Sequence, residues 1–341
     1  MIEQPILLIH GFNGSPGNWT GPEDRFPEFL AQHGYDPALI RVFSYGYDNY
    51  KGKRIYNNLG DVRQIAHRLD LAGSADPDER QESVDRLCED SVARGGPNKV
   101  TIIAHSSGGL IARYYLTRQQ PDAMGTQYRS NVGRVIFLGT PHQGVDVEDI
   151  LDPLPTNLLI YQLMVRLHYL LPPEYHEQAQ SLRHRFHESH HQTKQALAGD
   201  KAASEEPEEI PAFKELHPHS PFLEEINAPG AMPQHIAYHN IIGDIQAHVR
   251  FQLFDRTLLD HVKSFGDLMV TTGSASTIPN APSRCYPLVQ EHTLDVDLSR
   301  HLSRLAETSD AGVHPAPLHR WLRSLPAARD RMLEILGGIS A

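Results

Sequence analysis

The chain has 341 residues, a formal net charge of −11 and 40% hydrophobic residues, which is the balance of an ordinary folded protein and not of a disordered or fibrous one. A negative charge without a basic stripe argues against a nucleic-acid partner, because that affinity rests on clustered Lys and Arg. The two cysteines, Cys88 and Cys285, are too few for a disulfide framework and lie in no Cys-x-x-Cys, although they can still pair with each other.

The N-terminal residues MIEQPILLIHG contain no basic segment, and their apolar run is too short for a signal peptide. We therefore expect a cytoplasmic protein. The longest apolar stretch, residues 154–171, is interrupted by polar residues such as Asn157 and Arg166. A stretch broken in this way does not meet the length that a membrane-spanning helix requires.

Short apolar runs bounded by Gly, Pro or Asn recur along the chain and are typical of buried strands. They lie at residues 6–9, 38–43, 100–104, 135–138, 236–242 and 286–289. Segments with helical periodicity lie between them, at residues 58–71, 78–94 and 107–118. This alternation predicts an α/β fold, with a mostly parallel central sheet and helices on both faces.

The alternation stops after Gly144 and resumes at Ile236, which indicates a helical insertion. Residues 156–171 are apolar around much of a helix, and we expect the insertion to form a cap over the site. Residues 174–209 are rich in His, Gln, Glu and Lys and are expected to be solvated, either within the cap or as a disordered tail.

The predicted organisation has three parts. Residues 1–145 form the first part of the core, residues 146–233 the helical cap, and residues 234–341 the second part of the core.

The sharpest motif is Val100-Thr-Ile-Ile-Ala-His-Ser-Ser-Gly-Gly109, an apolar strand that runs through a turn into a helix. A nucleophile elbow requires this order of elements, and the motif predicts Ser106 as the nucleophile. Small residues at Ala104 and Gly108 allow strand and helix to approach closely, although the first position is Ala where Gly is more usual.

A second motif, Ile6-Leu-Leu-Ile-His-Gly-Phe-Asn13, is an apolar strand that ends in His-Gly. A backbone N–H in the loop after such a strand can bind an oxyanion together with the N–H of the residue after the nucleophile. We therefore assign Phe12 and Ser107 as the backbone donors of an oxyanion hole.

With Phe137-Leu-Gly-Thr-Pro-His-Gln-Gly144 and Gly266-Asp-Leu-Met-Val270, these motifs make the chain resemble the lipase and esterase family of α/β-hydrolases. Triacylglycerol lipases and GPI inositol-deacylase-like serine hydrolases are the branch that it resembles. The resemblance covers most of the chain outside the charged half of the insertion, and residues 218–227 resemble the return from the cap. It implies an α/β-hydrolase fold with a Ser-His-Asp triad and no cofactor, and His142 is given a structural role.

The acid of the triad is expected after the nucleophile and before the histidine. Asp267 lies in a Gly-Asp-x-x-Val segment that resembles the acid loop of the family, where a carboxylate orients the imidazole. Asp244 is the competitor, because it lies nearer the preceding strand, but it lacks the Val and Ser-Ala that follow Asp267.

The base has to be chosen among 21 histidines. In related sequences the catalytic histidine is followed by an apolar residue three positions later and by a proline seven positions later, and His319 reproduces this pattern with Leu322 and Pro326. His292 competes because it directly follows the last expected strand, and His314 lies in the same loop as His319. The assignment to His319 implies an unusually long loop after that strand.

The segment His187-Glu-Ser-His-His191 matches the zinc-protease pattern His-Glu-x-x-His. Its neighbours are polar on nearly every face, unlike those of a helix that buries a catalytic zinc. The metalloprotease with Glu188 as base is therefore kept only as a remote alternative, and no metal is assigned.

These assignments predict a serine hydrolase that cleaves carboxylic esters through an acyl-enzyme on Ser106. A thioesterase, an amidase or an acyltransferase on the same triad, or a non-catalytic binding module, are the alternatives. The expected partner is a small-molecule or lipid ester, with a transient lipid-interface contact through the cap and no stable protein partner.

A hydrophobic acyl chain is favoured if apolar residues near the site line a pocket and do not belong to the core. The candidates are Phe12, Trp19, Tyr45, Tyr47 and residues 156–171.

Overall fold

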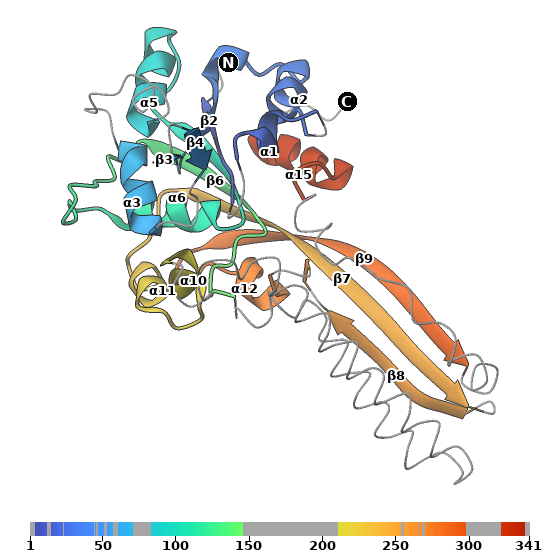
Figure 1. Cartoon of the computed structure of the whole chain (residues 1–341). Coiled ribbons are helices and arrows are strands. Elements are labelled where there is room, and N and C mark those ends of the chain that lie inside the picture. Colours follow the sequence, from blue (N-terminus) through green and yellow to red (C-terminus); the bar gives the residue numbers. More distant parts are fainter. Residues whose placement is uncertain are drawn as a thin grey trace.

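A central sheet flanked by helices forms the body of the molecule, and a three-stranded arm projects from it (Figure 1). The structure is a computed structural model. It describes residues 4–11, 15–22, 24–43, 45, 47–50, 53–56, 61–70, 83–145, 211–253, 256–264, 266–267, 270–297 and 322–337.

The central sheet has seven strands in the order β2-β1-β5-β6-β7-β8, and β9 pairs with β7. All neighbours are parallel except β7 and β8. The strands are β1 (Ile6–Ile9), β2 (Ile40–Phe43), β5 (Val100–His105), β6 (Val132–Leu138), β7 (Ala237–Leu253), β8 (Arg256–Ser264) and β9 (Ser283–Asp297). Strands β3 (Tyr47–Tyr50) and β4 (Lys53–Tyr56) form a separate antiparallel pair. The predicted mostly parallel sheet is confirmed.

Helices cover both faces of the sheet. Successive side chains of a strand point to opposite faces, so one strand contributes to two separate buried clusters. Leu7 and Ile9 of β1 join a buried cluster with α3, α5, α6 and α11, whereas Ile6 and Leu8 join a second cluster with α1, α2 and α15. The helices are α1 (Gly17–Thr20), α2 (Phe26–Gln32), α3 (Val62–His67), α5 (Val84–Ala93), α6 (Gly108–Thr117), α10 (Pro211–Leu216), α11 (Pro221–Ile226), α12 (Thr272–Ser276) and α15 (Pro326–Leu336). This arrangement is the α/β-hydrolase fold that the motifs predicted.

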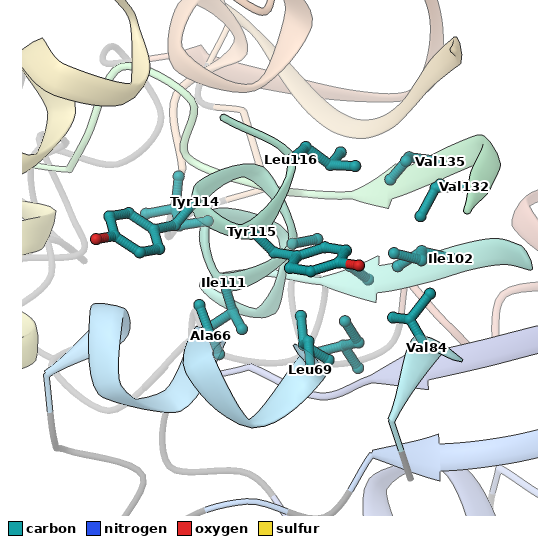
Figure 2. Close-up of a cluster of buried hydrophobic side chains, with 14 of the residues drawn as sticks. Ala66, Leu69, Val84, Ile102, Ile111, Tyr114, Tyr115, Leu116, Val132 and Val135 are labelled. Carbon is teal, nitrogen blue, oxygen red and sulfur yellow. The ribbon is translucent and has the colours of Figure 1, made fainter. Parts of the chain in front are cut away.

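Helix α6 is the centre of the first cluster. Figure 2 shows Ile111 and Tyr115 of α6 between α3 and the strands β5 and β6, near Ala66 and Ile102. Each fully buried large apolar side chain contributes about 1.5–3 kcal/mol to stability. The packing therefore holds α6, and with it the turn at its N-terminus, firmly against the sheet.

The arm is made by strands β7, β8 and β9, which continue beyond the body of the sheet (Figure 1). Pairing of β6 with β7 ends at Ile241, and β7 then pairs with β8 and β9 alone. From Ile242 to Leu253 the arm extends roughly 36 Å at about 3.3 Å per residue. The strands predicted at 236–242 and 286–289 are therefore real but much too short.

Helices α3 and α5 lie within the predicted helical segments 58–71 and 78–94 but have different boundaries. Helix α3 begins after Asp61, whose side chain accepts the N–H of Arg63 (2.7 Å), and ends in a short 3-10 turn, Arg68–Asp70. Helix α5 begins after Ser83, whose hydroxyl accepts the N–H of Arg86 (3.2 Å). These caps satisfy N–H groups that a helix start leaves unpaired, so they fix where each helix begins.

The described part of the predicted cap, residues 211–233, packs on the core. The ring of Phe222 in α11 stacks on Tyr114 of α6, with centroids 5.9 Å apart. Arg113 of α6 donates to the carbonyl of Ile226 (3.0 Å) and to Asn227 Oδ1 (2.7 Å). Residues 146–210 lie outside the described residues, and the three-part division of the chain stays a prediction.

The sequence left open whether the two cysteines pair, and it predicted that no helix spans a membrane. Cys88 is buried in α5 and Cys285 is exposed in β9, and both are free thiols, so they do not pair. None of the helices in the described ranges is both long and apolar enough to span a membrane.

Candidate active site

Ser106 lies at the sharp turn between β5 and α6, in a left-handed conformation with φ 54°. Its N–H donates to the carbonyl of Leu138 at the end of β6 (2.9 Å), and its carbonyl accepts the N–H of Gly109 (3.0 Å). A left-handed non-glycine residue costs about 1–3 kcal/mol and persists only where its surroundings enforce it. His105 and Ser107 are buried on either side, whereas Ser106 is partly exposed. The left-handed turn between strand and helix, with a partly exposed serine, is the arrangement that a nucleophile elbow requires.

Two glycines bring the loop after β1 against this turn. A Cβ atom at Gly108 would lie 2.3 Å from the carbonyl oxygen of His10, and one at Gly11 would lie 2.6 Å from the Cβ of Ser106. No side chain fits at such distances. Gly108 was expected to let β5 and α6 approach each other closely. The backbone that lies closest to Gly108 is instead that of His10, directly after β1. The segment that leads to the expected oxyanion loop therefore runs beside Ser106.

Ser107 occupies the N-cap position of α6, a helix of 10 residues. Its backbone N–H has no acceptor among the residues that the structure describes. The N-terminus of a helix favours negative charge, because unpaired N–H groups and the helix dipole point the same way. This N–H is therefore suited to bind an oxyanion. Phe12, the other predicted donor, lies outside the described residues.

Asp267 is 1% exposed and lies in a tight turn. Its Oδ1 accepts the N–H of Val270 (2.8 Å), and its own N–H donates to the carbonyl of Val270 (3.3 Å). Gly266 makes this turn possible, since it has φ 63° and a Cβ there would lie 2.1 Å from the Val270 carbonyl. Val270 packs on Ile242 of β7. The turn of Asp267 is thus attached through Val270 to the part of β7 that follows its pairing with β6.

Asp244, the competitor for the acid, lies in a strand and not in a loop. It is a buried residue of β7, where its Oδ1 accepts the hydroxyls of Ser264 and Thr272 (3.3 Å for Thr272). Its Oδ2 accepts Gln246 Nε2 (2.8 Å). Gln246 and Ser264 belong to strands β7 and β8 of the arm, whereas Thr272 belongs to helix α12. Asp244 therefore joins the two ends of the β7–β8 hairpin.

Of the three candidate histidines, only His292 lies in the described part of the chain. It is a residue of β9 in the arm, opposite Ala247. It follows Pro287, which pairs with Ile242, by five residues, or roughly 16 Å at about 3.3 Å per residue. The expectation that His292 directly follows the last strand is wrong, because β9 continues to Asp297.

His314 and His319 lie outside the described residues, but the chain directly after His319 is described. Leu322 and Arg323 are 0% and 1% exposed. The Arg323 guanidinium donates from Nη1 to Nδ1 of His105 (3.4 Å) and from Nη2 to Asp24 Oδ2 (3.3 Å). The side chain of Arg323, four positions after His319, therefore contacts the residue that precedes Ser106.

His142 is fully buried and faces Asn240, with Nε2 and Oδ1 3.1 Å apart. Its ring meets the ring of Phe137 edge-on at 4.7 Å. Burial, with a smaller contribution from the positive charge of Arg113, holds the pKa of His142 well below its usual value. A neutral imidazole enclosed in this way fits the structural role expected for it.

Two aromatic residues expected near a pocket belong to the core instead. Trp19 is 0% exposed and packs against Phe26. Tyr45 is 1% exposed, and its ring stacks on His10 with centroids 4.1 Å apart. Their assignment to an acyl pocket is therefore wrong, since buried side chains of the core do not meet a substrate. Tyr47 lies in β3, and residues 156–171 lie outside the described residues.

Sequence analysis missed the two contacts that brace the elbow. Arg323 was not singled out, and Tyr45 was assigned to a different role. The only local signal was the His-Gly pair at the end of β1, which marks His10 as the neighbour of the oxyanion loop. Nothing in the sequence connects His10 with Tyr45, 35 positions later, or His105 with Arg323, 218 positions later, because these contacts exist only in the folded chain.

Comparison with known proteins finds one family model and partial similarity to lipases. A family model described as Domain of unknown function (DUF7379) matches residues 73–301. Triacylglycerol lipases from Pseudarthrobacter phenanthrenivorans and Burkholderia plantarii are each 27% identical over 161 residues, which is 45% of this chain. The matches span 39% and 35% of the two lipases, so the chain covers well under half of either. They confirm the resemblance to lipases that the motifs indicated.

Solved structures with a similar chain trace include lipase 1 from Pelosinus fermentans and naproxen esterase from Bacillus subtilis. The first is 13% identical, with a TM-score of 0.44 and full coverage of both chains. The second is 15% identical, with a TM-score of 0.41, and covers 98% of this chain and 83% of its own.

Proposed function

We propose that this chain, which belongs to the DUF7379 family of domains of unknown function, is a serine hydrolase that cleaves carboxylic esters. The observation that carries the proposal is the strained turn at Ser106, which has φ 54°, is partly exposed and lies beside the segment after β1. The partial similarity to two triacylglycerol lipases supports the same class of reaction.

In the proposed reaction Ser106 Oγ attacks the ester carbonyl carbon, and the imidazole of His319 accepts the hydroxyl proton. The N–H groups of Ser107 and Phe12 bind the oxyanion that forms on the former carbonyl oxygen. His319 then gives its proton to the leaving alkoxide oxygen, which yields an acyl-enzyme and an alcohol. Water attacks the acyl-enzyme by the same path, and Asp267 orients the imidazole and stabilises its protonated form.

His319 is preferred as the base because the chain just after it is anchored next to the nucleophile. Leu322 lies three positions after His319, a span of at most about 11 Å. The contact of Arg323 with His105 keeps that region within reach of Ser106. His292 lies in β9 of the arm, five residues beyond Pro287, which pairs with Ile242 at the end of the body.

Asp267 is preferred as the acid because Asp244 already has other partners. Both Asp244 oxygens accept hydrogen bonds at the base of the arm, from Ser264, Thr272 and Gln246. A carboxylate that is used in this way is poorly placed to orient an imidazole. The turn at Asp267 contains the Gly-Asp-x-x-Val segment that the resemblance singled out.

The proposed substrate is an ester with a hydrophobic acyl chain, presented as a small molecule or at a lipid surface. The insertion between Gly144 and α10 supports this proposal, since its residues 156–171 are apolar. A panel of p-nitrophenyl esters of increasing chain length, with matched thioesters and amides, tests it. Faster turnover of the thioesters or amides would replace the esterase by one of the alternatives on the same residues.

The nucleophile is tested by substitution and by labelling. Ser106→Ala should reduce kcat for p-nitrophenyl butyrate by roughly 10⁴–10⁶ while the protein stays folded, because only binding and the oxyanion hole remain. Ser107→Ala is the matched control, since it removes a neighbouring hydroxyl but keeps the backbone N–H. A fluorophosphonate should label Ser106 alone. Labelling of another residue, or loss of activity in Ser107→Ala only, would refute the assignment.

The base is tested in the same assay. His319→Ala should match Ser106→Ala in residual kcat, and the double variant should lose little more, because the two residues act as one unit. His292→Ala and His314→Ala should each cost roughly tenfold or less. An inactive but folded His292→Ala beside an active His319→Ala would overturn the assignment.

A further inference from the structure

His10 is the last residue before the predicted oxyanion loop, and its side chain is completely buried. Burial, and to a lesser degree the positive charge of Arg323, lowers the pKa of His10 to about 4, although its hydrogen bond to Gly11 opposes this effect. The imidazole is therefore neutral near pH 7 and carries one proton, on either Nδ1 or Nε2.

The surroundings of the ring decide which nitrogen carries the proton. Nδ1 lies 3.1 Å from the carbonyl oxygen of Gly11, which can only accept a hydrogen bond. Nε2 is buried and faces no partner within the described residues. A proton on Nε2 would leave a buried donor unpaired, at a cost of about 1–3 kcal/mol, and would set two lone pairs against each other at Nδ1. His10 is thus the Nδ1–H tautomer and donates to the Gly11 carbonyl.

Tyr45 contacts the same stretch of backbone through its hydroxyl group. Its hydroxyl donates to the carbonyl of His10 (2.6 Å) and lies 3.4 Å from the carbonyl oxygen of Gly11. The Tyr45 ring is stacked on the His10 ring at an interplanar angle of 12°. Burial raises the pKa of Tyr45 far above its usual range, so the phenol stays a donor. Two side chains therefore fix the direction of two successive carbonyl groups.

The direction of the Gly11 carbonyl matters because of peptide geometry. The carbonyl of one residue and the N–H of the next lie in one plane and point in opposite directions in a trans peptide. The N–H that shares a peptide with the Gly11 carbonyl is that of Phe12. The structure describes the Gly11 carbonyl, which His10 and Tyr45 contact, and not Phe12 itself.

We infer that His10 and Tyr45 are positioning residues, which hold the Gly11–Phe12 peptide in the orientation that aims the Phe12 N–H at the reacting carbonyl oxygen. The inference rests on the proposed function, because it deepens the account of the same oxyanion hole. A peptide free to rotate would present its carbonyl to the developing negative charge, which repels it. The two side chains thus act on the transition state without touching the substrate.

The test uses three substitutions in the full chain. His10→Asn keeps a side-chain N–H close to the position of Nδ1, whereas His10→Leu removes it. Tyr45→Phe removes only the hydroxyl. Tyr238→Phe is the matched control, because Tyr238 is also buried and donates to a backbone carbonyl, that of Pro233 (2.8 Å), on a part of β7 that serves no proposed catalytic role.

The expected pattern is a loss of kcat with little change in KM. His10→Leu should lower kcat roughly 100-fold and Tyr45→Phe roughly tenfold, compared with about 10²–10³ for deletion of an oxyanion donor. Both should weaken inhibition by a trifluoromethyl ketone, which forms an oxyanion on the enzyme, by similar factors. His10→Asn should recover most of the activity, and Tyr238→Phe should match wild type in kcat and inhibition.

The second-order rate constant for labelling by a fluorophosphonate tests the proposed function and the positioning role separately. Wild-type protein that neither hydrolyses esters nor reacts with the reagent would refute the proposed function itself. A reactive wild type together with equally reactive His10→Leu and Tyr45→Phe would overturn only the positioning role. Equal losses in Tyr45→Phe and Tyr238→Phe would also overturn it, because the effect would then be one of general stability.

Discussion

The close approach of Gly11 to the nucleophile gives the most direct quantitative prediction. In Gly11→Ala the new methyl group would lie 2.6 Å from Ser106 Cβ, 2.9 Å from the His105 carbonyl oxygen and 3.3 Å from Ser106 Oγ. Carbon atoms in contact are normally about 3.5–4.0 Å apart, so the loop after β1 has to retreat from Ser106 by about 1 Å. A displacement of that size in an active site costs about 10²-fold in rate, and overpacking costs about 1–3 kcal/mol in stability.

The assay is kcat/KM for p-nitrophenyl butyrate, with the free energy of unfolding measured in parallel by urea denaturation. Gly273→Ala is the control, because Gly273 lies in α12 and a Cβ there meets no atom within 4 Å. That variant should keep full activity and gain about 0.5–1 kcal/mol from helix propensity. Activity of Gly11→Ala within about threefold of wild type would refute the reasoning, because a loop displaced by about 1 Å cannot support full activity.

Three further predictions separate roles that the sequence alone left open. Asp267→Asn should lower kcat by about 10³–10⁴ with a small change in stability, whereas Asp244→Asn should cost about 1–3 kcal/mol of stability and leave the folded enzyme active; the opposite pattern would exchange the two roles. Burial and two neighbouring arginines lower the pKa of His239 to about 4 from 6.5, so the unfolded chain binds more protons between these values. Stability should therefore fall as pH drops from about 6.5 to 4, and urea titrations should find a shallower fall in His239→Asn; an equal or steeper fall contradicts this reading. Treatment with EDTA and the substitution Glu188→Ala should both leave esterase activity unchanged, and loss of activity in both would restore the metalloprotease hypothesis.

The elbow could be predicted from the sequence because its signal is local. An apolar strand, a serine between small residues and a helix follow one another directly from Val100 to Gly109, and the left-handed Ser106 conforms to that pattern. The alternation of strands and helices likewise predicted the parallel sheet. In both cases the residues that determine the structure are neighbours in the chain.

The arm could not be predicted because its strands pass through residues that normally end strands. Gly243 and Asp244 follow Ile242, and a buried carboxylate in mid-strand is unfavourable on its own. It becomes favourable only because Ser264 and Thr272, far along the chain, supply hydroxyl donors. The sequence left open whether Trp19 and Tyr45 line a pocket or belong to the core for the same reason, since an aromatic residue near a motif can face either the substrate or the interior.

The junction at Asp244 has a consequence for how this fold tolerates change. The chain leaves the body at Asp244 and returns at Ser264, and the hydrogen bond between these two residues closes the detour. Removal of residues from the tip of the hairpin in matched pairs preserves the alternation of side chains on each strand. Because β9 pairs with β7 as far as Asp297, this trimming also removes the partners of the last residues of β9. A hairpin shortened by two residues in each of β7 and β8, with Asp244 and Ser264 kept, is thus a starting point for grafting other sequences onto this arm.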